Sequence, residues 1–211
     1  MKLAFGKDPA WIASSFETSE IEVPDEKRHD AMSIGPEPTA TNAPSVVWVP
    51  SPNFWHGRKG QPVLAIVLHI MQGTLHGTDA WFQDRKSDVS AHYGVGRNGE
   101  IHKYVATSDS AWHAGVVVDP TAPLVLEHPD VNPNLWSIGI EHEGMSGDTL
   151  TNAQYAASQW LCQDLVKTFA IPADPKFFIP HHTINAKHAG CPGTGFPLER
   201  LLEDLTDQGG V

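Results

Sequence analysis

The hydrophobic pattern along most of the chain alternates between strand-like and helix-like segments. Residues 63–69, VLAIVLH, are apolar on both alternating faces, which is typical of a central strand that is covered on both sides. Two more strands are predicted within residues 89–105, joined by a turn at Asn98-Gly99, because Asn-Gly is a strong hairpin signal. Residues 137–144, SIGIEHEG, predict a further strand.

Three segments predict helices. The longest covers residues 151–170, where Thr151 and Gln154 form a capping box, apolar side chains share one face and a proline follows the end. Residues 77–86 and 197–205 predict shorter helices. Strands and helices interleaved in this way favour an α/β fold, in which a central mixed β-sheet is flanked by helices.

The first part of the chain differs from the rest. The full length of 211 residues suits one domain, or one domain with an appendage. Residues 1–46 hold four basic and eight acidic side chains and end in GPEPTATNAP, a composition typical of a linker. We expect residues 1–46 to form a tail or a loosely docked arm, with a short helix from Asp8-Pro9 to Phe16 as one option. The functional domain is expected at 47–211.

Composition excludes several classes of protein. The formal charge of −11 argues against nucleic acid or an anionic membrane as a partner, since both require a basic surface. No apolar run reaches the roughly 18 residues of a membrane helix, and the start, MKLAFGKDPAW, lacks the long apolar core of a secretory signal. We therefore expect no membrane insertion and no signal peptide. Two cysteines exclude a disulfide framework and a four-cysteine zinc module, whereas twelve histidines are an excess.

Histidine and cysteine gather near two predicted loops. His69 ends its strand, as either a buried, hydrogen-bonded histidine or a functional group. His181 and Cys191 lie in one loop, and imidazole and thiolate are preferred zinc donors, so both could share a metal with His69. The alternative is that Cys191 is a small buried apolar residue and His182 a surface residue.

Glu141 is the candidate for acid–base chemistry. Strand alternation places Glu141 and Glu143 on one face and Ile138, Ile140 and His142 on the other. A carboxylate in an otherwise apolar strand could act as the general base for a water at a metal. It could also be a sheet-edge residue that pairs with a lysine or arginine.

Five motifs in order carry a family resemblance: LHIMQGT, VSAHYGVGRNGEIHKYV, SAWHAG, SIGIEHEG and HHTINAKHAGCPG. Together they closely resemble the zinc-dependent N-acetylmuramoyl-L-alanine amidases, a family that includes phage endolysins, muropeptide-recycling amidases and animal peptidoglycan recognition proteins. The resemblance runs from about Val47 to Leu205 and leaves 1–46 unexplained. It implies a peptidoglycan-recognition-protein-like fold with one catalytic zinc domain.

The resemblance also implies a role for individual residues. His69, His181 and Cys191 match the ligands of one zinc ion per chain. Glu141 matches the acidic residue that assists the zinc water in the recycling-type branch. The shorter phage branch uses a tyrosine where this chain has Ala91.

One position departs from the family pattern. Many members have a lysine two residues before the last ligand, where this chain has Ala189. Lys187 or His188 could stabilise the oxyanion in its place, with His188 preferred, or zinc could suffice alone. The resemblance further implies that His113, Tyr93 and Trp112 are groove residues that contact substrate. His92 is expected to be structural. The insertion at 116–134 is expected to form a rim that shapes access of the peptide to the groove.

The implied activity is hydrolysis of the amide bond between N-acetylmuramic acid and L-alanine in peptidoglycan or a muropeptide. We expect a monomeric phage or prophage endolysin, cytoplasmic in the producing cell and acting on the cell wall after release. The alternatives are a cytoplasmic muropeptide-recycling amidase and a non-catalytic peptidoglycan-binding module. A zinc peptidase is a third possibility, although the motif order does not favour it.

Overall fold

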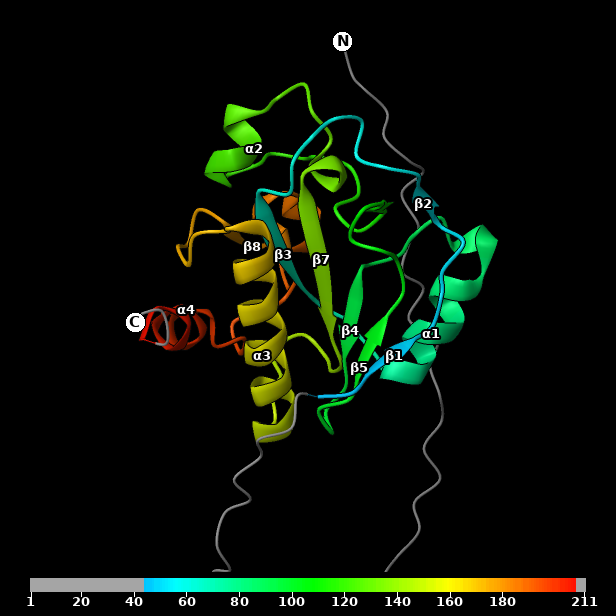
Figure 1. Cartoon of the computed structure of the whole chain (residues 1–211), viewed down its shortest axis with the longest axis vertical. Helices are drawn as coiled ribbons and strands as arrows, with labels where there is room; N and C mark the ends of the chain where they lie inside the picture. The colour runs from blue at the N-terminus through cyan, green and yellow to red at the C-terminus, as the bar shows by residue number, and fades with distance from the viewer. Residues whose placement is uncertain (1–43, 208–211) are drawn as a thin grey trace, which may run out of the picture.

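A six-stranded mixed sheet forms the centre of the computed structural model, which describes residues 44–207 (Figure 1). The strand order is β1-β5-β4-β7-β3-β8. β3 pairs in parallel with β7 and β8, and β7 pairs in parallel with β4, whereas β4 and β5 are antiparallel. The strands are β1 (Val46–Trp48), β3 (Ala65–Ile70), β4 (Tyr93–Val95), β5 (Ile101–Lys103), β7 (Ser137–His142) and β8 (Phe178–Pro180). The expected mixed sheet is confirmed.

The remaining elements surround this sheet. A small antiparallel sheet pairs β2 (Phe54–Trp55) with β6 (Ser110–Ala111). The α-helices are α1 (Leu75–Gln83), α2 (Pro123–Glu127), α3 (Asn152–Phe169) and α4 (Leu198–Asp207). Short 3₁₀ turns are η1 (Arg85–Ser87), η2 (Pro133–Leu135), η3 (His181–Thr183) and η4 (Ala186–His188). None of the helices in residues 44–207 combines the length and apolar character that a membrane crossing requires.

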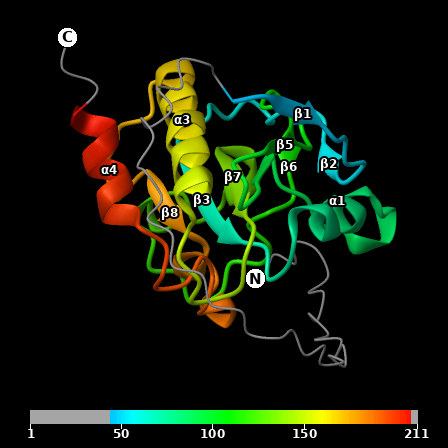
Figure 2. The same ribbon diagram turned by 90° about the horizontal axis from the view of Figure 1, so that it is seen from below.

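Helices α3 and α4 lie together on one side of the sheet (Figure 2). The Thr151 hydroxyl caps α3 by accepting a hydrogen bond from the backbone N–H of Gln154, as the capping box predicts. Leu161, Cys162 and Leu165 of α3 are buried against strand side chains such as Ile138 and Ile140. Burial of this apolar face fixes the sheet on the helices, and Cys162 is a core residue as expected.

The other face of the sheet carries a smaller apolar cluster. Ala65 and Val67 of β3 pack there with Trp136, Ile179 and Ile184. Because side chains alternate along a strand, His69 lies on this same face, two residues beyond Val67. At the carboxyl end of β3, this face of the sheet therefore carries the imidazole of His69 next to the smaller apolar cluster.

Several sequence-based boundaries differ in detail. Helix α1 begins at Leu75, two residues before the expected start, because the Thr74 side chain caps it by accepting from Gly77 N. The rim expected at 116–134 contains the short helix α2. Residues 1–43 lie outside the described part of the chain, and with them the expected helix near Phe16 and nearly all of the expected arm. The expected boundary after residue 46 falls within β1.

Candidate metal centre

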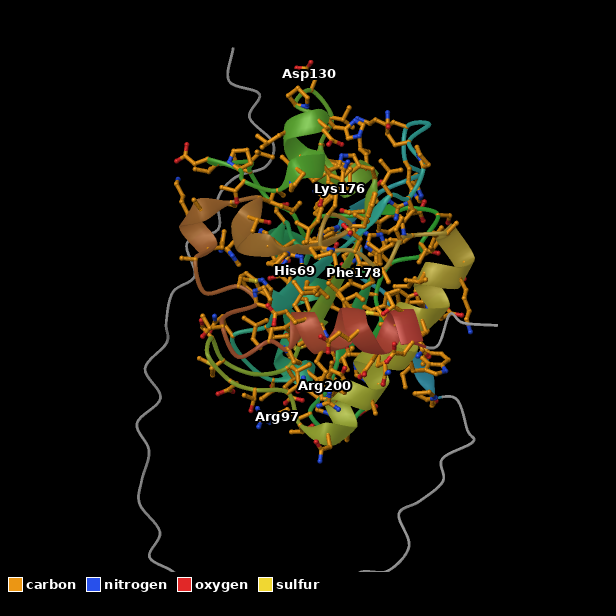
Figure 3. All side chains as sticks on the ribbon, turned by 90° about the vertical axis from the view of Figure 1, so that its left-hand side faces the viewer. His69, Arg97, Asp130, Lys176, Phe178 and Arg200 are labelled. Carbon is orange, nitrogen blue, oxygen red and sulfur yellow. The ribbon has the colours of Figure 1, made fainter. Side chains whose placement is uncertain are left out.

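Three side chains from different parts of the chain converge at the end of β3. The ligand atoms of His69, His181 and Cys191 all lie within 4.8 Å of one another. Strand β8 runs parallel to β3, so His181, which directly follows β8, emerges at the same sheet edge as His69. Figure 3 marks His69 and Phe178 on these two neighbouring strands. The sequence-based prediction that these three residues lie together is thus matched by the geometry.

In His69 and in His181, the ring nitrogen Nε2 takes part in a hydrogen bond, so Nδ1 is the nitrogen that remains for a metal. His69 Nε2 lies 3.2 Å from His113 Nδ1, while His69 Nδ1 lies 3.8 Å from Cys191 Sγ. His181 Nε2 donates to the Ala114 carbonyl at 3.2 Å. Burial lowers the pKa of His181 to about 4 and holds the pKa of His69 well below its usual range. Both imidazoles are therefore neutral near pH 7, the form that binds a metal.

Cys191 supplies a sulfur in a largely buried setting. The Ile70 backbone N–H donates to Sγ at 3.5 Å. Burial, reinforced by the nearby Glu141 carboxylate, raises the pKa of the Cys191 thiol above its usual range. A divalent cation reverses this preference, because a coordinating thiol loses its proton. The sulfur is thus suited to a metal and not to service as a free nucleophile.

The loop that carries Cys191 is held from two sides. The His182 backbone N–H donates to the Cys191 carbonyl at 2.9 Å. On the other side, the Ser146 hydroxyl donates to the Gly190 carbonyl at 2.8 Å. A Cβ at position 190 would lie 2.2 Å from Ser146 Oγ, so only glycine permits this approach. The sulfur is therefore positioned by its loop as well as by Ile70.

Glu141 lies beside the cluster on β7, where it is the register partner of His69. Its Oε1 lies 3.9 Å from His69 Nδ1, and its Oε2 is buried and finds no hydrogen-bond partner among residues 44–207. Desolvation by burial raises the pKa of this carboxyl group to about 8. An orphaned acceptor next to two imidazoles and a thiol fits a zinc site with one open position, where a water would donate to the carboxylate.

The expected groove residues occupy three different environments. His113 is 7% exposed and its ring contacts that of His69, so the structure places it beside a candidate ligand and not on an open groove wall. Trp112 is half-buried, with its ring 5.7 Å from that of Trp55. Tyr93 is not brought to the site: it is buried in the core on the α3 side of the sheet, opposite Glu141. Strand alternation separates Tyr93 from the site face.

The two oxyanion candidates differ in position. Both belong to η4, which precedes Cys191. The His188 ring is stacked on that of His181, with 4.8 Å between the centroids, and His188 is half-buried. The Lys187 side chain is exposed. The structure therefore brings His188 to the cluster.

The sequence analysis did not identify Ser137 and Arg58, two buried polar residues near the candidate site. The Ser137 hydroxyl lies 3.2 Å from His113 Nε2. A sequence signal existed, because Ser137 and Gly139 share the strand face of Glu141. Arg58 donates to the carbonyls of Thr107 and Ser137, and burial lowers its pKa to about 10. No sequence signal distinguishes this arginine, which precedes a Lys-Gly pair in a loop.

Comparisons with known proteins find similar sequences. A family model described as N-acetylmuramoyl-L-alanine amidase matches residues 59–194. The chain is 27% identical over 184 residues to N-acetylmuramoyl-L-alanine amidase A of Achromobacter lyticus, covering 78% of this chain and 95% of that one. It is 34% identical over 117 residues to the 1,6-anhydro-N-acetylmuramyl-L-alanine amidase AmpD of Haemophilus influenzae, covering 56% of this chain and 59% of that relative.

Solved structures show the same fold. A crystal structure of an AmpD derivative superposes with a TM-score of 0.62 at 26% identity, covering 75% of this chain and 93% of that one. AmiD from E. coli, solved with anhydro-N-acetylmuramic acid-L-Ala-D-gamma-Glu-L-Lys, gives 0.57 at 25% identity, covering 69% and 58%. The endolysin LysCS from Clostridium intestinale gives 0.54 at 20% identity, covering 79% and 99%, which shows the fold alone.

Proposed function

The chain belongs to the N-acetylmuramoyl-L-alanine amidase family and is an enzyme of that class, and we propose that it works with one zinc ion held by His69, His181 and Cys191. Its reaction is hydrolysis of the amide bond between N-acetylmuramic acid and L-alanine. The observation that carries this proposal is the convergence of three ligand atoms within 4.8 Å, next to a carboxylate that has one orphaned oxygen.

The donor set determines what the ion contributes. Zinc held by two imidazoles and a thiolate supplies Lewis-acid polarisation of the scissile carbonyl and lowers the pKa of water toward about 7. His69 and His181 are already neutral, so they require no proton release on binding. Cys191 releases its thiol proton and lowers the net charge of the site.

Glu141 is assigned as the proton carrier. Its orphaned Oε2 accepts the proton of the attacking water and later delivers it to the nitrogen of the leaving L-alanine. Burial raises the pKa of the carboxyl group to about 8, so its ionised form is a stronger base than an exposed glutamate. The water attacks the lactyl carbonyl, the C–N bond breaks, and the products are a carboxylic acid and a free amino terminus.

His188 is assigned to the oxyanion in preference to Lys187. Its ring is stacked on the ligand His181, whereas the Lys187 side chain is exposed. A ring N–H that points to the carbonyl oxygen would stabilise the negative charge that develops there. We therefore propose His188 for the role that Ala189, which has no polar side chain, does not fill.

Soluble anhydro-muropeptides are the proposed substrate class. The Haemophilus influenzae relative is named for the 1,6-anhydro sugar, and the AmiD structure carries an anhydro-muramyl tripeptide. The chain's charge of −11 provides no attraction for an anionic cell wall. An endolysin that acts on intact wall is the second candidate, supported by structural similarity to endolysins that extends to fold alone.

A direct comparison of substrates tests this choice. The zinc-loaded protein is assayed on anhydro-muropeptides and on purified sacculi under identical conditions. Faster hydrolysis of the soluble substrate with no clearing of sacculi supports the recycling-type assignment. Clearing of sacculi supports the endolysin instead, and binding without hydrolysis of either substrate supports a non-catalytic module.

A further inference from the structure

A line of hydrogen bonds runs from the protein interior to the first histidine of the cluster. The Ser137 hydroxyl donates to the Pro133 carbonyl at 2.7 Å and lies 3.2 Å from His113 Nε2. The other nitrogen of that ring, Nδ1, lies 3.2 Å from His69 Nε2. All three side chains are buried, so water does not compete for these positions.

The protons along this line have one consistent arrangement. A hydroxyl has a single hydrogen, and the shorter contact of Ser137 is with the Pro133 carbonyl, which can only accept. Ser137 Oγ is therefore an acceptor toward His113 Nε2, which must carry the ring hydrogen. A neutral imidazole carries one ring hydrogen, so with that hydrogen on Nε2 the Nδ1 of His113 is bare. That bare nitrogen accepts from His69 Nε2–H.

We infer that Ser137 and His113 are positioning residues that fix the tautomer of His69. In the metal-free protein, the Nδ1 of His69 is therefore already unprotonated and able to bind a metal. This inference rests on the proposed zinc site. His69 Nδ1 is the nitrogen that faces Cys191 Sγ at 3.8 Å and Glu141 Oε1 at 3.9 Å. The hydrogen bond to His113 thus selects the His69 tautomer that has its hydrogen on Nε2 and leaves Nδ1 unprotonated.

The His113 ring is held in place by its surroundings. Asn134 Oδ1 accepts hydrogen bonds from the backbone N–H groups of His113 and Ala114, at 3.0 and 2.8 Å. The ring lies directly over Gly139 of β7, where a Cβ would be 2.4 Å from His113 Cγ. A glycine between Ser137 and Glu141 thus makes room for the ring that connects Ser137 to His69.

His181 provides an internal control. Its Nε2 donates to the Ala114 carbonyl, a backbone group that no substitution at position 137 removes. Ser137→Ala therefore leaves the His181 tautomer unchanged. In the same variant His113 loses its acceptor and is free to move its hydrogen to Nδ1. His69 Nε2 would then become the acceptor, and the hydrogen of His69 would move to Nδ1, the ligand nitrogen.

The test is a long-range proton–nitrogen correlation spectrum of the ¹⁵N-labelled, metal-free protein, which separates protonated from bare ring nitrogens. In the wild type we expect a protonated Nε2 and a bare Nδ1 for both His69 and His181. In Ser137→Ala, His69 shifts toward protonated Nδ1 while His181 does not. Zinc affinity, measured by chelator competition, falls roughly 10- to 100-fold, as for other residues that orient ligands from outside.

A second pair of variants covers the case in which Ser137→Ala fails to fold. His113→Asn keeps an acceptor oxygen near the position of Nδ1, whereas His113→Leu removes it. We expect zinc affinity to be largely retained in the first and lowered in the second. Protonated Nδ1 on wild-type His69, or equal zinc affinity in the asparagine and leucine variants, would overturn the inference. Zinc binding with the expected tautomers but without amidase activity would instead contradict the proposed function.

Discussion

His69 and Glu141 occupy paired positions on the neighbouring parallel strands β3 and β7, and Nδ1 of the imidazole lies 3.9 Å from Oε1 of the carboxylate. The register of the two strands thus places the proposed ligand His69 and the proposed base Glu141 side by side without help from a flexible loop. Because both residues lie in the central sheet, their separation is fixed by backbone hydrogen bonds. Only the remaining ligands, His181 and Cys191, depend on segments outside the strands.

Glu141→Gln removes the base while keeping the volume of the side chain. We expect kcat to fall by about 10²- to 10⁴-fold, the usual contribution of general acid–base catalysis, with zinc content unchanged. Glu143→Gln is the matched control: Glu143 shares the strand face, but its Oε2 accepts from the Arg97 backbone N–H. Equal activity in the Glu141 variant and the wild type would exclude Glu141 as the proton carrier.

The two cysteines should differ in their effect on zinc. Cys191→Ala removes one of three ligands, so we expect zinc content after dialysis to fall well below one per chain. Cys162→Ala leaves the site intact and costs about 1 kcal/mol of stability, because Cys162 lies on α3 and is fully buried in the core between that helix and the sheet. Metal analysis of both proteins is the measurement. Full zinc content in the Cys191 variant would rule out a thiolate ligand.

His188→Ala and Lys187→Ala test the oxyanion assignment. Loss of one oxyanion donor typically lowers kcat by about 10²- to 10³-fold. We expect an effect of this size for His188, whose ring is stacked on His181, and little change for Lys187, whose side chain is exposed. Steady-state kinetics at saturating substrate separates the two. The reverse order of effects would transfer the role to Lys187.

Stability of the metal-free protein should fall as the pH drops below 6.5. Burial lowers the pKa of His142 to about 4 and that of His92 to about 3, and it holds His69, His113 and His181 below the usual range as well. Between pH 6.5 and 4 the unfolded chain binds protons that the folded chain does not, which favours unfolding by about 1.4 kcal/mol per pH unit for each proton.

Two groups act in the opposite direction. The raised pKa of Glu141, about 8, means that the folded chain holds one extra proton between pH 8 and 4.5. Against the effect of burial, hydrogen bonds with Asp79 and Glu100 raise the pKa of His102, so the folded chain also holds an extra proton there above pH 6.5. Five histidines have lowered pKa values, so the net slope below pH 6.5 still favours unfolding in acid. Urea unfolding at pH 7, 6 and 5 measures the slope, and His142→Gln should reduce it by about one proton. A free energy of unfolding that stays constant from pH 7 to 5 would contradict the buried, neutral histidines.

The candidate ligands and the candidate base could be proposed from the sequence because their signals are local. His181 and Cys191 fall within one short motif, and the alternation of SIGIEHEG assigns Glu141 to a defined strand face. The long helix was predictable from its cap and its apolar face. These features require no knowledge of how distant segments pack.

The remaining features depend on tertiary contacts. His113 was expected in an open groove, but the missing side chain at Gly139 and the Asn134 amide place it behind His69. Tyr93 was expected near the substrate. It shares a strand face with Val95, and both side chains are buried in the core on the α3 side of the sheet. The two-residue strands β2 and β6 are too short to produce an alternating pattern.

Mass spectrometry of the products from a defined anhydro-muropeptide tests the central claim most directly. Zinc-loaded protein should release the intact stem peptide with a new L-alanine amino terminus, together with a muramic acid product that carries a free lactyl carboxylate. Removal of zinc by a chelator should stop the reaction, and its return should restore it. Cleavage within the stem peptide or between sugars, or full activity in the zinc-free protein, would contradict the account.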